Sequence, residues 1–298
     1  MDSGRDIAII SLKNKSAATL FADSLRSTGF AVLTDHPVDS ELINRFYDVW
    51  AEFFASGNKH EWLRDPTTHA GYFPFGEENA KDSAVKDLKE FFHIYPFAHV
   101  PEICATPTRA LYQVLLDLGR QLLVWIEESL PANIAVRLSC PLSDMVGDND
   151  QSLLRVLHYP PLNGQEAAAA IRAAPHEDIN LITLLLAGSQ PGLQVQHRDG
   201  SWMAVPTRHD WIVVNAADML QVATNGYFRS ATHRVINPPS AENQHAENNA
   251  LNVSRFSAPM FIHPKPNIEL QKGLTAGQFL NQRLRAIGLG EKPDMKVL

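Results

Sequence analysis

Residues 176–186 read HEDINLITLLL, a polar His-x-Asp followed directly by an apolar run. The apolar part has the length of a buried strand. More strand-like runs lie around it, at residues 153–159, 192–196, 211–215, 230–236 and 252–262. Turn residues such as Gln190-Pro191-Gly192 and Asp199-Gly200 separate these runs. Many short strands with this spacing predict a double-sheet jelly roll, or double-stranded β-helix.

Helical periodicity marks the sequence on both sides of these strands. Apolar residues recur at helical spacing in 16–28, 39–55 and 106–130, and Thr275-Ala276-Gly277-Gln278 is a capping box that opens a helix running towards residue 287. Residues 29–33, GFAVL, read as a short buried strand between the first two helices.

We therefore expect a mainly β core with flanking helices, α+β overall. The expected organisation is a helix-rich region over 1–150, a catalytic jelly-roll core over 151–265, and a helix and tail over 266–298. Residues 163–174 and 240–249 are polar or low in complexity, and we expect both to be exposed loops.

The composition is that of a globular enzyme, with 298 residues, 45% of them hydrophobic and 20% charged. The net charge of -7 argues against nucleic acid as a partner. Cys104 and Cys140 are the only cysteines and have no metal-ligand spacing, which favours a reducing compartment. No apolar run approaches the ~20 residues of a membrane span and no secretory signal is visible, so we expect a cytoplasmic protein.

Three residues form a candidate metal site. Residues two apart in a strand share a face, so His176 and Asp178 can point at one spot, and His233 can join them from the apolar run 231–236. Two imidazoles and one carboxylate leave coordination positions of an iron ion open for an oxidisable ligand and O₂. His197-Arg198-Asp199 has the same spacing but leads into a turn signal, so we expect it at the surface.

A candidate anion site follows on the next expected strand. Arg255 and Ser257 share a face by the same two-residue period, and a guanidinium and a hydroxyl can bind one carboxylate together. A buried guanidinium without an anion is unfavourable, so an inward-facing strand arginine implies a bound anion.

As a set, these motifs resemble the isopenicillin-N-synthase-like branch of the 2-oxoglutarate and Fe(II)-dependent dioxygenases. That branch has His-x-Asp, a distal histidine in a His-Arg-Val context after Asn-Gly, and Arg-x-Ser. This chain has them at His176-Glu177-Asp178, Asn225-Gly226 with His233-Arg234-Val235, and Arg255-Phe256-Ser257. Gly71-Tyr72 and Asp87-Leu88-Lys89-Glu90 are similar to the family's N-terminal region, so the resemblance covers most of the chain.

The resemblance implies a set of ligands. Fe(II) would be held by His176, Asp178 and His233, and the distal carboxylate of the co-substrate 2-oxoglutarate by Arg255, Ser257 and Tyr159. O₂ would be the oxidant. The family's Asn-Tyr-Tyr-Pro motif reads Leu157-His158-Tyr159-Pro160 here, so a contact from the missing asparagine is not carried over.

The resemblance also implies hydroxylation of an unactivated C–H bond in a small or carboxylate-bearing substrate, with release of succinate and CO₂. Arg155 alternates with Leu157 and Tyr159 and is a candidate to bind an anionic substrate, a surface ion pair being the alternative. Residues 71–93 and 176–185 are also similar to enzymes that hydroxylate the sugar acid Kdo in lipopolysaccharide. Peripheral membrane contact would follow only for such a substrate.

Three alternatives stay open at this point. The first is an oxidase like isopenicillin N synthase, which needs no 2-oxoglutarate and would use Arg255 and Ser257 for the substrate's own carboxylate. The second is a zinc hydrolase with the same three metal ligands, which would turn over without O₂. The third is a non-catalytic binding module.

Overall fold

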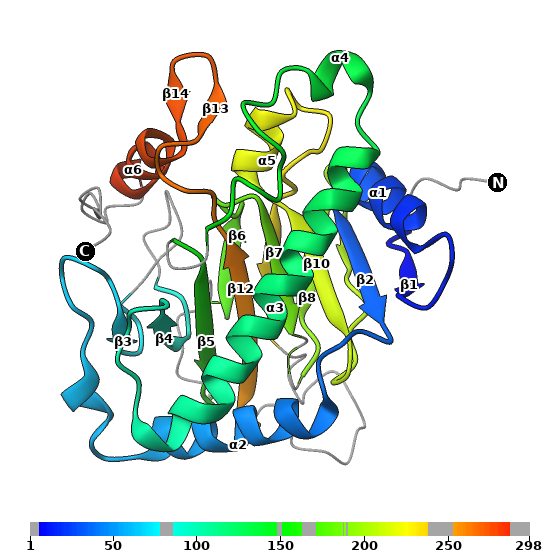
Figure 1. Cartoon of the computed structure of the whole chain (residues 1–298). Coiled ribbons are helices and arrows are strands. Elements are labelled where there is room, and N and C mark those ends of the chain that lie inside the picture. The colour runs from blue at the N-terminus through cyan, green and yellow to red at the C-terminus, as the bar shows by residue number, and fades with distance from the viewer. Residues whose placement is uncertain are drawn as a thin grey trace.

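The computed structural model describes residues 6–77, 86–147, 151–162, 171–186, 188, 190–237 and 253–286. Within them, two β-sheets form a jelly roll, and helices cover the larger sheet (Figure 1). The large sheet has eight strands in the order β1-β2-β10-β7-β12-β5-β4-β3, and the small sheet has four in the order β6-β11-β8-β9. The predicted fold class is confirmed.

The strands of the large sheet are β1 (Ile9–Ser11), β2 (Phe30–Thr34), β10 (Ile212–Ala216), β7 (Ile182–Leu186), β12 (Arg255–Ile262), β5 (Leu153–Tyr159), β4 (Glu90–Ile94) and β3 (Gly71–Phe73). Those of the small sheet are β6 (Ala173–His176), β11 (His233–Val235), β8 (Leu193–Gln196) and β9 (Trp202–Ala204). A separate hairpin joins β13 (Glu269–Gln271) to β14 (Leu274–Thr275). The helices are α1 (Ala17–Thr28), α2 (Ser40–Ala55), the 3-10 helix η1 (Lys59–Trp62), α3 (Glu102–Glu128), α4 (Ala132–Ala135), α5 (Asp218–Ala223) and α6 (Ala276–Ala286).

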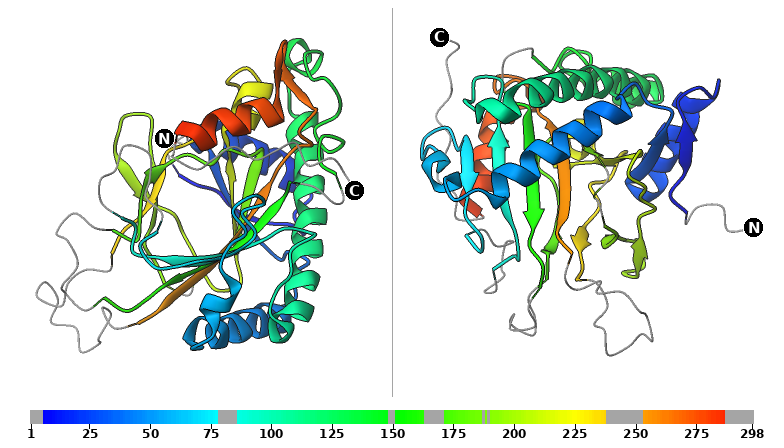
Figure 2. Two further views of the ribbon diagram at one scale, coloured as in Figure 1. Left: turned by 90° about the vertical axis from the view of Figure 1, so that its left-hand side faces the viewer. Right: turned by 90° about the horizontal axis from the view of Figure 1, so that it is seen from below.

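The main hydrophobic core lies between the large sheet and the helices. Alternate residues of the central strands, such as Val156, Leu184 and Met260, point to this side and pack with apolar residues of α1, α2 and α3. Figures 1 and 2 show α3 and α2 crossing this face of the sheet. A Cβ added at Gly119 of α3 would lie 2.8 Å from Ile262 Cδ1, so the glycine permits the close approach of α3 to β12.

The other face of the large sheet looks towards the small sheet. A second apolar cluster combines residues of both sheets, among them Phe30 and Val213 from the large one and Val195 and Val235 from the small one. A third, small cluster on the same face of the large sheet consists of Phe73, Phe91, Leu157 and Tyr159. The polar residues of the expected site lie on this inner face as well.

The N-terminal part of the chain belongs to the same sheet as the later strands. β2 pairs with β10 along Phe30 to Leu33, and β4 pairs with β5 along Glu90 to Ile94. Strands from before residue 150 thus form both edges of the large sheet, and β5, β12, β7 and β10 form its middle. The boundaries at 150 and 265 stay a prediction.

Most of the predicted elements are present. The helices expected over 16–28 and 39–55 are α1 and α2, and the strand expected over 29–33 is β2. The capping box is confirmed, since Thr275 Oγ1 accepts from the Gln278 amide at 3.3 Å and Gln278 Oε1 accepts from the Thr275 amide at 3.0 Å.

Two local predictions were wrong. The helix expected over 106–130 begins earlier, at Glu102, because buried Cys104 extends its apolar face, and Pro107 lies inside the helix. Asn225 and Gly226, with φ of 51° and 80°, form a turn after α5, where the Gly226 amide donates to the Gln221 carbonyl.

The second wrong prediction concerns the expected loop over 163–174. Its last two residues belong to β6, while 163–170 and the whole loop over 240–249 lie outside the described residues. As for membrane association, the described helices include none with both the length and the apolar character of a bilayer span.

Replacement of Trp50 tests how much the hydrophobic core between the large sheet and the helices contributes to the stability of the protein. The Trp50 side chain is fully buried, its Nε1 donates to Thr108 Oγ1 at 2.9 Å, and its ring packs on Phe53 and Phe92. We expect Trp50→Ala to lower the free energy of unfolding by about 3–5 kcal/mol in urea titration. Val136→Ala, at a position 80% exposed, should change it by less than about 0.5 kcal/mol. Equal stability of the two variants would contradict this packing.

Candidate functional site

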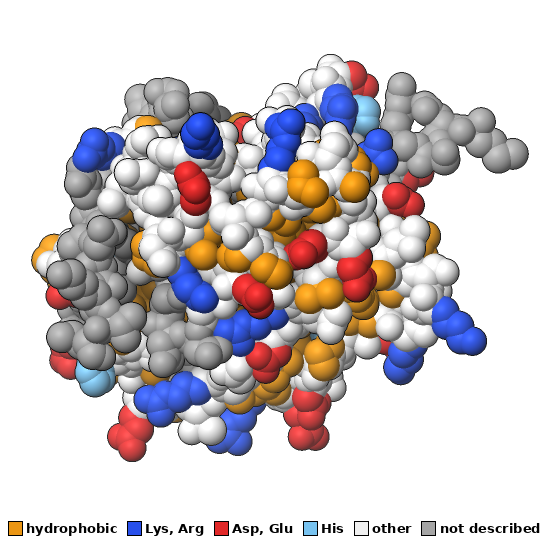
Figure 3. Space-filling view, turned by 45° about the horizontal axis from the view of Figure 1, so that its top comes forward, with side chains coloured by type: hydrophobic (Ala, Val, Ile, Leu, Met, Phe, Trp, Pro, Cys, Tyr) orange, Lys and Arg blue, Asp and Glu red, His pale blue; other side chains and the backbone are white. Residues whose placement is uncertain are grey.

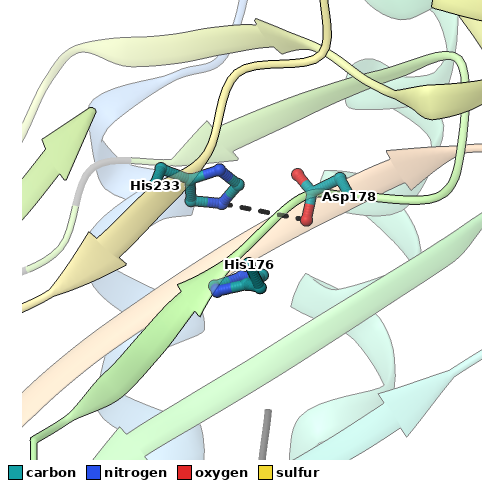
Figure 4. Close-up of side chains that lie close together, drawn as sticks. All are labelled: His176, Asp178 and His233. Atoms are coloured by element: carbon teal, nitrogen blue, oxygen red, sulfur yellow. Dashed lines mark ion pairs between the residues drawn. The ribbon is translucent and has the colours of Figure 1, made fainter. Parts of the chain in front are cut away.

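His176, Asp178 and His233 lie together at the junction of the two sheets. One ligand atom from each residue falls within 4.8 Å of the others (Figure 4). His176 and His233 are direct partners in the pairing of β6 with β11, and His233 Nε2 lies 3.8 Å from Asp178 Oδ1. Among the described residues, this is the one group of three or more potential ligands with metal-site spacing.

The position of Asp178 differs from the sequence-based expectation. β6 ends at His176, so Asp178 lies past the strand and its direction is not set by a two-residue period. Instead, Asp178 Oδ2 accepts hydrogen bonds from Thr183 Oγ1 at 2.6 Å and from Asn215 Nδ2 at 2.9 Å. Thr183 is on β7 and Asn215 on β10, so the large sheet positions a ligand that follows a strand of the small sheet.

Both histidines present the same ring nitrogen to the site. His176 Nδ1 lies 2.7 Å from the Ala174 carbonyl oxygen, and His233 Nδ1 lies 3.1 Å from that of Ala231. A carbonyl only accepts, so each Nδ1 carries the proton and each Nε2 keeps a lone pair for a metal ion. Burial, followed by the charge of His233, lowers the pKa of His176 to about 4, which keeps this ring neutral near pH 7.

Asp178 supplies the negative charge. Its burial alone would raise its pKa, but the two histidines and the hydrogen bonds from Thr183 and Asn215 hold the pKa below its ordinary value. Two imidazoles and one carboxylate, each oriented by a second hydrogen bond, are a donor set that suits Fe(II) with open positions.

The second His-x-Asp lies where the sequence predicts it. His197 and Asp199 flank a turn after β8, and Asp199 Oδ1 accepts from the amide and hydroxyl of Ser201. The Asp199 side chain is half exposed, and its other neighbour is His197 Nδ1 at 3.4 Å. Neither residue joins the ligand cluster.

Arg255, Ser257 and Tyr159 meet on the inner face of the large sheet. Arg255 pairs with Tyr159 across β12 and β5, and its guanidinium carbon lies 5.0 Å from the centre of the Tyr159 ring. Arg255 is 1% exposed; its Nη1 donates to Ser257 Oγ at 3.1 Å and its Nε to the Gln190 carbonyl at 3.0 Å. No carboxylate of the described chain pairs with Arg255.

Gly188 makes room for this guanidinium. A Cβ added at Gly188 would lie 2.7 Å from Arg255 Nη2 and 3.0 Å from the carbonyl oxygen of Phe256. Both distances are too short for an ordinary contact, so residue 188 has to be a glycine if Arg255 keeps its position.

Arg155 also lies on the inner face, four residues along β5 from Tyr159. Its Nε donates to His93 Nε2 at 2.8 Å, and its guanidinium carbon lies 4.4 Å from the Phe91 ring centre and 5.5 Å from that of Phe261. The strand alternation therefore placed Arg155 on the correct face.

Sequence reasoning missed a second buried arginine. Arg172 is 1% exposed, its guanidinium carbon lies 5.9 Å from the Tyr159 ring centre, and its Nη2 donates to the Val253 carbonyl at 3.3 Å. Burial, followed by the positive charge of Arg255, lowers its pKa to about 10. Arg172 alternates with Ala174 and His176, a signal that was available but was hidden by the interpretation of 163–174 as a loop.

A buried ion pair in the segment just before β4 was also missed. Lys89 Nζ lies 2.8 Å from Asp87 Oδ2, and both side chains are less than 10% exposed. Asp87 Oδ1 also accepts from the Ala174 amide at 3.0 Å, which ties β6 to the segment before β4. The outer surface differs from this basic interior: on the face shown in Figure 3, described acidic and basic side chains are interspersed.

Comparison with known proteins assigns the family. Residues 150–264 match the model of the 2OG-Fe(II) oxygenase superfamily, and residues 6–110 match that of the non-haem dioxygenase N-terminal region in morphine synthesis. A 2-oxoglutarate-dependent dioxygenase of Monascus ruber, citB, is 30% identical over 75% of this chain and 76% of its own length.

Two solved structures are similar over nearly their whole length. A Shewanella oneidensis protein described as an oxygenase is 42% identical, with a TM-score of 0.84 over 95% of this chain and 99% of its own. A Caulobacter crescentus protein of the 2OG-Fe(II) oxygenase family is 30% identical, with a TM-score of 0.77 over 94% and 99%. With a jelly roll that brings two histidines and an aspartate together, this chain belongs to the 2OG-Fe(II) oxygenase superfamily and is a dioxygenase that uses Fe(II), 2-oxoglutarate and O₂.

Proposed function

We propose that this enzyme hydroxylates a C–H bond of a small, carboxylate-bearing substrate, with Fe(II) held by His176, Asp178 and His233. The observation that carries the proposal is a buried guanidinium, Arg255, with no carboxylate partner in the described chain, on the sheet whose residues orient the ligand Asp178. A buried unpaired cation calls for an anionic ligand. The co-substrate 2-oxoglutarate supplies one.

In this proposal Arg255, Ser257 and Tyr159 bind the distal carboxylate of 2-oxoglutarate. The Arg255 guanidinium neutralises its charge, while the hydroxyls of Ser257 and Tyr159 are available as further donors. When bound, Fe(II) and 2-oxoglutarate supply the oxidising chemistry with O₂, and 2-oxoglutarate leaves as succinate and CO₂. The protein orients both ligands and keeps solvent away from them.

Arg155 is proposed to contact the substrate. It lies on the same face of β5 as Tyr159, and β5, β12 and β7 are adjacent strands at a spacing of about 4.8 Å, which puts its backbone on the order of 10 Å from Thr183, the residue that orients Asp178. A sugar acid such as Kdo is one substrate to test, because residues 71–93 and 176–185 are similar to enzymes that hydroxylate it. The protein would then act next to a membrane without spanning it, and in the cytoplasm.

Two measurements separate this proposal from its alternatives. An anaerobic titration of the Fe(II)-loaded protein with 2-oxoglutarate should develop the charge-transfer absorption of the chelate, and aerobic incubation without substrate should convert 2-oxoglutarate slowly to succinate. An oxidase that binds its substrate's carboxylate at Arg255 would do neither. A zinc hydrolase would be active without O₂, whereas this enzyme should not be.

Asp178→Ala tests the metal ligands. Removing the one carboxylate should reduce Fe(II) affinity by at least 100-fold and abolish succinate formation, while circular dichroism stays that of the folded protein. Asp199→Ala is the matched control, because it removes the aspartate of the other His-x-Asp, which lies in a turn away from the cluster. Full activity of Asp178→Ala, or equal losses in both variants, would refute the assignment.

Arg255→Gln tests the co-substrate site. Loss of a charge-assisted hydrogen bond costs about 1.5–3 kcal/mol, so the Kd for 2-oxoglutarate should rise about 10- to 150-fold. The Kd of 2-oxopentanoate, which lacks the distal carboxylate, should change little. Gly188→Ala should also raise the Kd of 2-oxoglutarate and leave that of 2-oxopentanoate nearly unchanged, because the added Cβ would displace the Arg255 guanidinium. Equal effects on both oxo acids would argue against this site.

A further inference from the structure

Arg172 is a buried cation to which the proposed function assigns no role. It is 1% exposed and makes one hydrogen bond within the described part of the chain, from Nη2 to the Val253 carbonyl, while its Nε has no partner there. No carboxylate in the described part of the chain pairs with it. A structural role would not require a full positive charge at this point, because a neutral side chain could also donate to that carbonyl.

Arg172 lies beside the ligand site. Its guanidinium and that of Arg255 both approach the Tyr159 ring, at 5.9 and 5.0 Å from the ring centre to the guanidinium carbon. The positive charge of Arg255 contributes to the lowered pKa of Arg172, as expected for two cations close together. Arg172 also lies four residues before the ligand His176, just ahead of β6. Two positive charges therefore lie in one buried region, where anionic ligands would neutralise them.

The charges of the loaded site leave Arg172 without a counter-ion. The two positive charges of Fe(II) and the one of Arg255 are matched by Asp178 and the two carboxylates of 2-oxoglutarate. Lys89 is matched by Asp87, to which it is bonded at 2.8 Å. Among the described residues, Arg172 is the remaining buried cation without an anionic partner, which favours a further negative charge from another ligand.

We infer that Arg172 binds the carboxylate of the substrate and is a specificity-determining residue of this enzyme. The inference rests on the proposed function, and it names the residue that makes a carboxylate a requirement for binding. Arg155 differs from Arg172 in its surroundings, because its Nε is already donated to His93 and its guanidinium lies over Phe91. An anionic ligand would therefore stabilise Arg172 more than Arg155.

The test uses the full-length Fe(II) protein saturated with 2-oxoglutarate under anaerobic conditions. Acetate, phenylacetate, cyclohexanecarboxylate and free Kdo are titrated as carboxylate probes, with phenylacetamide as the neutral analogue of phenylacetate. Binding is followed by calorimetry and by the change in the absorption of the 2-oxoglutarate chelate. The variants are Arg172→Gln, Arg172→Lys and, as a control, Arg229→Gln, which removes a part-buried arginine that also donates to a backbone carbonyl, that of Gln196.

We expect at least one carboxylate probe to bind the wild-type complex. Arg172→Gln should raise the Kd of that probe about 10- to 150-fold. Arg172→Lys should recover part of that affinity, since it keeps the charge, and phenylacetamide should be insensitive to all three variants. The Kd of 2-oxoglutarate should stay within about threefold of wild type. The ligand-free Arg172→Gln protein should unfold at or above the wild-type temperature, because an unpaired buried charge has been removed.

Several results would overturn the inference. Binding of no carboxylate to the wild type, or equal binding to Arg172→Gln, would exclude Arg172 as a substrate site. A rise of tenfold or more in the Kd of 2-oxoglutarate in Arg172→Gln would assign Arg172 to the co-substrate site instead. A loss of stability with unchanged probe affinity would make it structural. If the 2-oxoglutarate chelate never forms in the wild type, the proposed function itself fails, which is a separate outcome.

Discussion

The register of β12 between β5 and β7 is the constraint on which the site depends. Arg255 pairs with Tyr159, and Phe261 pairs with Thr183. Because neighbouring residues of a strand face opposite sides, a shift of one residue would turn Arg255 towards the helices. Ala258 and Met260, which lie between these two residues, and Ile262, which follows Phe261, are fully buried in the core beneath α3 and hold the register. Hydrophobic packing on one face of the sheet therefore positions the polar chemistry on the other.

The position of the three candidate metal ligands depends on the contact between the two sheets. His176 and His233 come from paired strands of the small sheet, whereas Asp178 is oriented by Thr183 and Asn215 of the large one. Such second hydrogen bonds fix ligand direction before a metal ion binds. The same interior holds two guanidinium groups, those of Arg255 and Arg172, without carboxylate partners in the described chain. That arrangement is unfavourable for the empty protein and becomes favourable once anionic ligands bind, as is usual at functional sites.

Elements with a long, regular hydrophobic pattern were predicted correctly from the sequence, and short elements were not. Long apolar stripes gave α1 and α2 within one residue, and strand alternation placed Arg255, Ser257 and Tyr159 on one face. Short elements such as α5 and β6 were missed, since their six and four residues carry too little periodicity, and the low-complexity residues before β6 favoured a loop. The error at β6 also concealed Arg172, because a residue assigned to a loop has no predicted face.

Local sequence was enough to predict the fold class, the family resemblance, and the two histidines and the aspartate of the candidate metal site, because these rest on periods of two and 3.6 residues and on motif order. It also separated His176 from His197, through the turn residues that follow the latter. The tertiary structure was needed to see how Asp178 reaches the histidines, which ring nitrogens face the candidate metal site, and which cations lack a counter-ion among the described residues. These depend on partners from strands far apart in the chain, such as Thr183, Asn215 and Tyr159, whose proximity arises from sheet pairing and not from local sequence.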